Sequence, residues 1–424
     1  MKTKFSFFAT LVLSVLLLCA CSKKDDVASE EYTNLTPEQN KQAIESAGTT
    51  FLSQVDGMKN LSALNVLSDF IHLTDNSEMK SAPIRDFVAP FVDIQQNVGA
   101  AMKMHVIGSG MQTLADLFND YAGIYTYRAS TNKWSAATST SEITYNFSAG
   151  SSSNASVSLN NFTYTKSPIA FTVGDYKGVL VKSVTLTIKN QGATVGSLVM
   201  TGEYNTDGTP SKINETLSFN EGYAFTSTFT NNGSAVNFEQ SLKKGSTELL
   251  SSHFDGKGDF SYNTIQTGTD SDDRDDIAKI ISGGNAWVKV GNIELIGKVD
   301  MKSILTTLPY KIDNTNKKAV DQEDSIISKY TTLYAKYIDK NQIIAKSEFY
   351  SMPCIGYNYS YTYDRYYGYR YIRTPYTYYE VGLRFKFKDD SYMDENFFQT
   401  GFDPFIEQLT ALGHACDINY NIHN

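Results

Sequence analysis

The sequence predicts an α+β fold: a large, curved antiparallel β-meander sheet with N- and C-terminal helices packed on its apolar face. Apolar residues alternate with Thr, Ser and Asn between about 178 and 265, as in an antiparallel sheet with one face on a core and one in water. Amphipathic helices would supply the cover that the apolar face needs. Turn-type glycines in the same stretch predict about seven strands joined by tight turns; they lie at positions 192, 208, 222, 233, 245 and 256.

The helical segment is expected over residues 36–120. Thr36 is a candidate N-cap, Pro37 suits the first helical position, and Gln39 completes a capping box. Apolar residues then recur at helical spacing as far as Phe118, in three or four helices.

The remaining chain, 121–424, is expected to form the sheet body with C-terminal helices, as one unit with 36–120. Trp287–Val290, Ile293–Val299 and 342–352 have strand patterns, whereas 317–339 is expected to be a helix. A last helix should begin at Asp403, followed by Pro404.

One strand gives a sharp test of the two-faced sheet. Tyr223, Phe225 and Phe229 alternate with Thr226 and Thr228. We therefore expect Phe225 to be buried and Thr226 to be exposed.

The N-terminus carries a secretory signal. A basic start precedes an apolar run from Phe5 to Leu18 that is too short to cross a bilayer as a stable helix. Leu18-Cys19-Ala20-Cys21 follows, then Ser22, Lys23, Lys24, Asp25 and Asp26.

This segment resembles Bacteroidota-type surface-exposed lipoproteins, on its lipobox and export tag alone. The resemblance implies a signal peptide over 1–20, a lipid on Cys21 and a lipidated tether over 21–35. It implies that the protein is anchored in the outer membrane through that lipid and faces the cell exterior.

Charge and histidine spacing exclude some functions. After removal of 1–20, 35 Lys and Arg would stand against 46 Asp and Glu, a formal charge of −11. Nucleic-acid binding needs clustered Lys and Arg, so no nucleic-acid partner is expected. The five histidines lack zinc-ligand spacing, and no metal site or cofactor is expected.

Two cysteines remain in the mature body, Cys354 and Cys416. They could form one disulfide in an oxidising compartment, or stay as two separate buried thiols. Spacing alone does not decide, since a bond needs the two Cα atoms within about 7 Å.

A tyrosine-dense segment is the candidate ligand-binding region. Twelve tyrosines lie between Tyr350 and Tyr379. Tyrosine offers a flat apolar ring and a hydroxyl at low entropy cost, which suits binding of a glycan or a protein. The alternation of Tyr with polar residues also fits an ordinary strand that packs its rings on the protein, and favours that alternative. The candidate binding residues are Tyr357, Tyr359, Tyr361, Tyr363, Arg365, Tyr367, Tyr369, Arg370 and Tyr371.

No catalytic signature is present, so the chain is expected not to be an enzyme. The function expected first is non-catalytic binding of an extracellular glycan or a host or partner surface. One alternative is an apolar-ligand (lipid) binder with a cavity between sheet and helices; a second is an unrecognised hydrolase.

Overall fold

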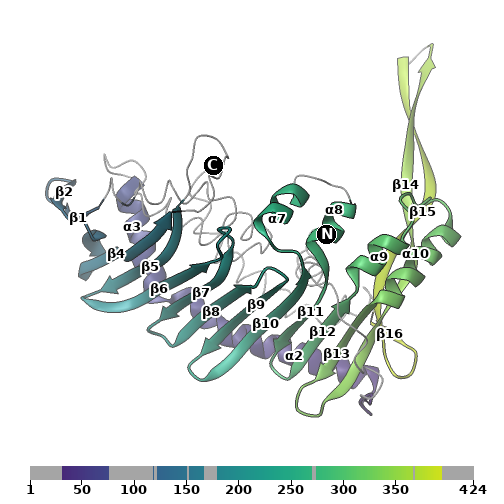
Figure 1. Cartoon of the computed structure of the whole chain (residues 1–424), viewed down its shortest axis with the longest axis horizontal. Helices are drawn as coiled ribbons and strands as arrows, with labels where there is room; N and C mark the ends of the chain where they lie inside the picture. The colour runs from purple at the N-terminus through teal and green to yellow at the C-terminus, as the bar shows by residue number, and fades with distance from the viewer. Residues whose placement is uncertain are drawn as a thin grey trace.

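One open, curved sheet of sixteen strands dominates the molecule, and neighbours in the sheet are almost always neighbours in the sequence (Figure 1). This computed structural model describes residues 31–75, 118, 122–149, 152–166, 179–269, 274–365 and 368–393. The sheet order is β16 to β3 in uninterrupted sequence, then β1 and β2. The strand pairs are antiparallel except β1 with β3, which run parallel. The expected α+β fold with a large meander sheet is confirmed.

The first part of the sheet holds the hairpins closest to the N-terminus. Its strands are β1 (Gly123–Arg128), β2 (Lys133–Thr138), β3 (Glu142–Ala149), β4 (Ser152–Lys166), β5 (Val179–Asn190), β6 (Ala193–Tyr204), β7 (Pro210–Phe219) and β8 (Tyr223–Asn231). The second part consists of β9 (Ala235–Lys244), β10 (Thr247–Gly258), β11 (Ile281–Val290), β12 (Ile293–Val299), β13 (Thr331–Tyr337), β14 (Gln342–Asp364), β15 (Gly368–Lys386) and β16 (Tyr392–Met393).

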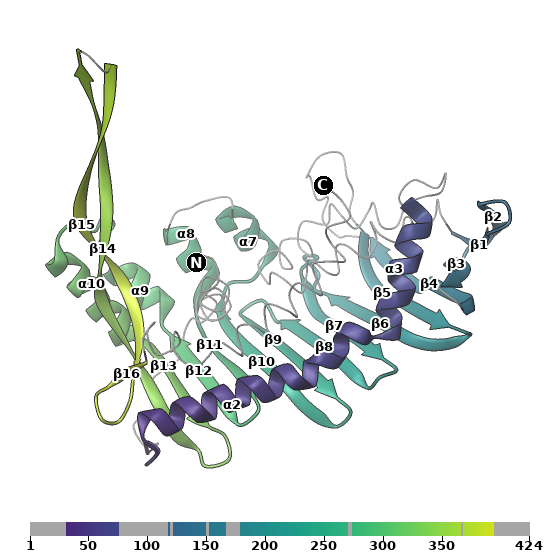
Figure 2. The same ribbon diagram turned by 180° about the vertical axis from the view of Figure 1, so that it is seen from behind.

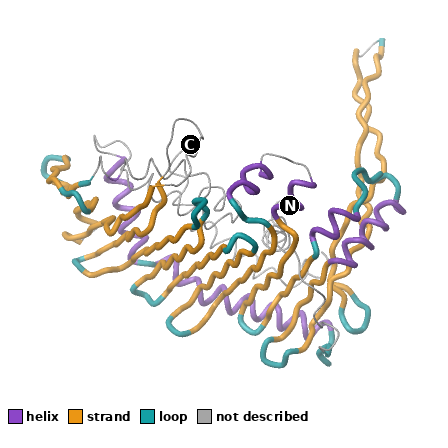
Figure 3. Tube along the Cα trace, in the orientation of Figure 1, coloured by secondary structure: helices purple, strands orange, loops and turns teal. Residues whose placement is uncertain are grey.

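The helices precede the sheet or interrupt it. They are α2 (Pro37–Val55), the 3-10 helix η2 (Asp56–Asn60), α3 (Ser62–Asp75), α7 (Tyr262–Thr269), α8 (Arg274–Ile280), α9 (Met301–Thr307) and α10 (Lys317–Tyr330). The purple helix α2 runs across the strands, and α3 continues over β3 to β6 (Figure 2). Figure 3 shows the helices against the continuous row of strands.

The start of α2 is as expected. Thr36 Oγ1 accepts a hydrogen bond from the Gln39 backbone N–H, and Gln39 Oε1 accepts one from the Thr36 N–H. This capping box satisfies two backbone donors that the first turn of the helix leaves without partners. The rest of the expected helical segment lies outside the described residues beyond Asp75, except for Phe118, as does the helix expected from Asp403.

Six strands, not seven, lie between Val179 and Gly258, and Gly256 accounts for the difference. Five of the six glycines that predicted turns have positive φ and stand between strands; they are Gly192, Gly208, Gly222, Gly233 and Gly245. Gly256 lies inside β10, where a Cβ would come within 2.8 Å of Val236 and 3.0 Å of Phe254. A glycine can mark close packing in a strand interior as well as a turn.

The prediction of a helix over 317–339 is confirmed as far as Tyr330 and is wrong beyond it. The chain is helical only to Tyr330 and continues at once as β13. Leu333, Ala335 and Tyr337 alternate with Thr332 and Lys336. Apolar residues at every second position indicate a strand, and this spacing is the better guide to the structure after Tyr330. The strands expected at Trp287–Val290, Ile293–Val299 and 342–352 are confirmed within β11, β12 and β14.

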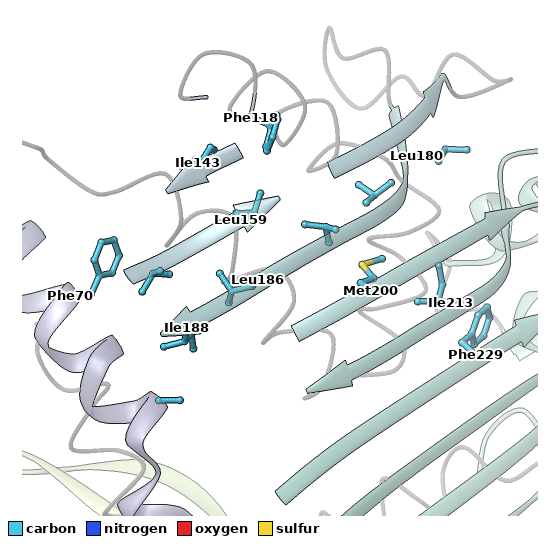
Figure 4. Packing of buried hydrophobic residues seen from close by; sticks show 14 of the residues in the cluster. Phe70, Phe118, Ile143, Leu159, Leu180, Leu186, Ile188, Met200, Ile213 and Phe229 are labelled. Atoms are coloured by element: carbon cyan, nitrogen blue, oxygen red, sulfur yellow. The ribbon is translucent and has the colours of Figure 1, made fainter. Parts of the chain in front are cut away.

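One face of the sheet forms the main core. Register pairs place Ile188, Met200, Ile213, Phe229 and Phe254 on the same side, and all are at least nine-tenths buried. Figure 4 shows the first four of them. The same cluster takes residues from α3, α7 and α9, namely Ala63, Val66, Phe70, Tyr262, Ile265 and Ile304. The helices therefore cover the apolar face, as expected.

The strand β8 shows that the two faces of the sheet differ only by degree in how deeply their side chains are buried. Phe229 is buried, but Phe225 and Thr226 are both half-buried. The predictions that Phe225 is buried and Thr226 is exposed are therefore both wrong. Thr216, on the polar face of β7, is exposed.

A carboxyl group interrupts the apolar face. Glu215 pairs with Met200 on β6 and Ser227 on β8, and its side chain is 4% exposed. No described residue forms a hydrogen bond with its Oε1, and burial raises the pKa of Glu215 to about 7. A neutral carboxyl is the form such a site favours.

We expect Phe229→Ala to lower the free energy of unfolding by about 3–5 kcal/mol, because it leaves a cavity in the core. Thr216→Ala, the control on the open face, should cost less than about 1 kcal/mol. Chemical denaturation of both variants checks this. Equal losses at the two positions would mean that both faces are covered.

Candidate functional site

The strands β14 and β15 form a hairpin that leaves the body of the molecule (Figure 1). They pair continuously from Lys346 with Lys386 to Asp364 with Gly368. The pairing of β13 with β14 ends at Lys346, and β16 pairs with β15 only at Phe385 and Lys386. The outer part is therefore a two-stranded ribbon, a structure that is marginal in water without additional packing.

Four tyrosines share one face of this ribbon; we call Tyr357, Tyr359, Tyr361 and Tyr363 the tyrosine ladder. Their register partners on β15 are Pro375, Arg373, Tyr371 and Tyr369. The exposed fractions are 55% for Tyr359, 70% for Tyr361 and 66% for Tyr363. Exposed apolar side chains gathered in one place mark an interaction surface.

The rings of the outer ladder are more than half exposed, although the sequence pattern favours packing on the protein's own surface. Tyr357, at 37% exposed, is shielded by Arg373, whose guanidinium carbon lies 3.3 Å from its ring centroid. On the other ribbon face, Tyr376 packs over Gly356 and lies 6.0 Å from Tyr378, centroid to centroid. The ladder rings are therefore less exposed near the base of the ribbon than toward its tip.

The other candidate binding residues lie at the tip. Arg365 is exposed and follows β14. Tyr369, Arg370 and Tyr371 belong to β15, but their side chains lie outside the described part of the chain, as does all of Tyr367. The structure therefore places the candidates on one hairpin.

Cys354 lies on this hairpin and carries a free thiol. Its Sγ is 3.8 Å from the Met352 carbonyl and 3.7 Å from Glu380 Oε2. Burial, followed by the nearby charge of Glu380, raises the pKa of the thiol. Cys416, the other half of the disulfide considered above, lies outside the described residues.

An open pocket of about 450 Å³ lies at the foot of the hairpin, against α10. One stripe of α10 forms one wall, and the first part of the hairpin forms the other. The lining residues are Lys317, Asp321, Asp324, Ser325, Ser328, Phe349, Tyr350, Ser351 and Arg384. The sequence does not predict this pocket, because its residues on α10 have the pattern of an ordinary exposed helix face. Only the fold brings Asp321 and Asp324 against Ser351.

Two carboxyl groups share one hydroxyl in this pocket. Ser351 Oγ lies 2.7 Å from Asp321 Oδ1 and 2.7 Å from Asp324 Oδ2. A serine hydroxyl has one proton to donate, so one of the two carboxyls has to supply the second hydrogen bond. Protonated Asp324, donating to Ser351, satisfies both contacts.

The surroundings favour this arrangement. Asp324 is 6% exposed, and burial raises its pKa, assisted by the charge of Asp321. Lys317 Nζ lies 2.6 Å from Asp321 Oδ1, and this hydrogen bond, with that from Ser351, lowers the pKa of Asp321. Of the two carboxyls, Asp324 is therefore the one that takes up a proton more readily, and Asp321 the one that stays charged to lower pH.

No family model, curated protein or solved structure matches this chain. Within the described ranges, no helix is both long and apolar enough to span a membrane. The same ranges contain no cluster of three or more His, Cys, Asp and Glu side chains arranged to hold a metal ion.

We expect Asp324→Asn to become more stable relative to the unchanged protein as pH rises from about 4 to about 8. A raised folded-state pKa contributes stability that is present at low pH and lost as pH rises through that pKa. An amide keeps a donor to Ser351 at every pH. Denaturant unfolding at several pH values measures the difference.

Asp321→Asn is the matched control. Its carboxyl has a lowered pKa, so its contribution is present above its ordinary pKa and is lost as pH falls. Between about pH 4 and pH 8 the stability difference for Asp321→Asn should therefore stay nearly flat, because the lowered pKa places its change below that range. A stability difference for Asp324→Asn that stays flat or falls with pH would contradict the assignment.

Proposed function

We propose that this protein is a non-catalytic surface lipoprotein that binds an extracellular glycan or a partner surface through the tyrosine ladder. The observation that supports this most is the exposure of Tyr359, Tyr361 and Tyr363 on a ribbon that leaves the body. More than half of the surface of each of these three side chains is open to solvent, where a ligand can reach it.

The chemistry of the ladder suits such a ligand. Each tyrosine presents an apolar ring face and a hydroxyl, and loses little conformational entropy when it is immobilised. Neighbouring ladder residues along β14 are two positions apart, so their attachment points are about 6–7 Å from each other. A chain of flat, hydroxyl-bearing units can therefore contact several rings in succession.

Membrane attachment would determine what the hairpin meets. In this proposal Cys21 carries the lipid, and Ser22 to Asp26 direct the protein to the outer face of the outer membrane. The described body begins at Glu31, so the intervening residues allow at most about 35 Å between lipid and body. The body would stay close to the membrane, and the ribbon would extend its reach.

The two alternatives receive less support. The pocket is lined largely by charged groups and hydroxyls, whereas a lipid would need a mainly apolar cavity. Ser351 is 9% exposed and its hydroxyl contacts two carboxyls. It is therefore placed to hold α10 against β14, not to attack a substrate.

We expect Tyr359→Ala and Tyr361→Ala each to weaken binding by at least about 2 kcal/mol, as aromatic anchors do at interfaces. The test uses the soluble chain from Ser22, a glycan array and a partner screen on whole cells, followed by affinity measurements on the hits.

Ser360→Ala, between the two tyrosines on the other ribbon face, should leave affinity unchanged. The thermal midpoint should stay close to that of the unchanged protein in all three variants, because the rings are exposed. A sharp fall in the midpoint, with affinity per folded molecule unaltered, would show that the tyrosines stabilise the hairpin and do not bind.

We expect Cys21→Ala to abolish labelling by a fatty-acid analogue in cells. Alanine at Lys23, Lys24, Asp25 and Asp26 together should keep the label but reduce cleavage by protease added to whole cells. Labelling of Cys21→Ala would refute the lipid assignment, and unchanged cleavage of the tag variant would refute the surface assignment.

A further inference from the structure

We propose that the pocket between α10 and the foot of the hairpin binds one neutral saccharide unit. The inference deepens the proposed function and rests on it for the choice of a saccharide. It concerns residues outside the tyrosine ladder, and its physical basis is separate.

The charged groups of the pocket are already balanced. Lys317 pairs with Asp321. The Arg384 guanidinium donates to Glu348, with Nε and the terminal nitrogen each 2.7 Å from Oε2. Asp324 Oδ2 is held by the Ser351 hydroxyl, so within the described part of the chain each charged side chain of the wall already has a polar partner. A charged ligand would lose hydration without gaining an opposite charge, whereas a neutral one avoids that cost.

Hydrogen-bonding capacity, by contrast, remains open. Ser325 and Ser328 are exposed on the pocket stripe of α10, and neither hydroxyl is hydrogen-bonded within the described part of the chain. Asp324 Oδ1 is a buried acceptor that has no hydrogen-bond partner among the described residues. An unsatisfied buried polar atom costs about 1–3 kcal/mol, which a ligand hydroxyl can recover.

The opposite wall adds apolar surface. Phe349 is half-buried and shares the strand face of Ser351 by alternation. The ring of Tyr350 packs over Gly382, and the Arg384 guanidinium lies 4.5 Å from its centroid. Hydroxyls on one side and ring carbons on the other match a sugar, which has polar edges and an apolar ring face. The volume of about 450 Å³ is within the range of small-molecule sites.

The position of the pocket connects it to the ladder. Ser351 and Tyr357 lie six residues apart on β14 and share a strand face by alternation, so about 20 Å separates them. One glycan could place a unit in the pocket and continue along the ribbon. The pocket would then hold one end of an extended glycan whose other units contact the ladder.

Saturation-transfer NMR with free sugars tests the proposal on the soluble chain from Ser22. The probes are glucose, galactose, mannose and N-acetylglucosamine, with galacturonate and glucosamine as charged counterparts. We expect at least one neutral sugar to bind, and to bind at least about fivefold more tightly than its charged counterpart.

Two variants of α10 locate the site. Ser325→Trp fills the pocket and should abolish the transfer signal. Gln322→Trp is the matched control, because Gln322 is exposed on the same helix outside the pocket, and it should leave the signal intact. Ser328→Ala should weaken binding about 3- to 10-fold through one lost hydrogen bond.

The outcomes separate the two proposals. No binding of any neutral sugar, equal binding of charged sugars, or equal loss in Gln322→Trp and Ser325→Trp would each overturn the pocket assignment. Ladder-dependent binding on the array would then leave the proposed function standing. Sugar binding in the pocket with no effect of Tyr359→Ala on any array ligand would instead refute the role of the ladder alone.

Discussion

The apolar face of an open sheet has to be shielded from water, and most of the architecture depends on that requirement. Sixteen strands offer far more apolar surface than one helix can cover. The helices α2 and α3 therefore run across many strands, and residues of α7 and α9 join the same core. The polar face needs no cover, and its Thr, Ser and Asn side chains meet solvent. The outer part of the hairpin leaves the covered region, so Tyr359, Tyr361 and Tyr363 are more than half exposed.

Buried carboxyl groups are the main exceptions to this division of the sheet. Glu215 lies among apolar side chains, and Asp324 is buried where α10 meets β14. Both have raised pKa values because burial disfavours the charged form. The environment of Asp324 includes a serine, a second carboxyl and an open pocket. Such a combination occurs at binding sites more often than in a core.

The sequence predicted what depends on local periodicity and turn chemistry. The α2 capping box, five glycine turns and the two-faced strands follow from neighbouring residues. Gly256 was misread because close packing and turn formation both favour glycine, and Val236, which it approaches, is distant in sequence. The pocket was missed for the same reason: Asp324 and Ser351 meet only in the fold. In the tyrosine ladder, the alternation of Tyr with polar residues indicates a strand. It does not indicate whether another part of the protein covers the rings.

The order of the strands also determines how the chain can fold. From β3 to β16 each strand pairs with the next one in the sequence, so most contacts close short loops. Folding rates rise as contacts become more local, and a sheet of this topology can grow hairpin by hairpin from any starting point. The contacts of α2 with β10 and β11 are the opposite case, since they join residues far apart in the chain. Docking of α2 should therefore be a late step that locks a sheet already largely formed.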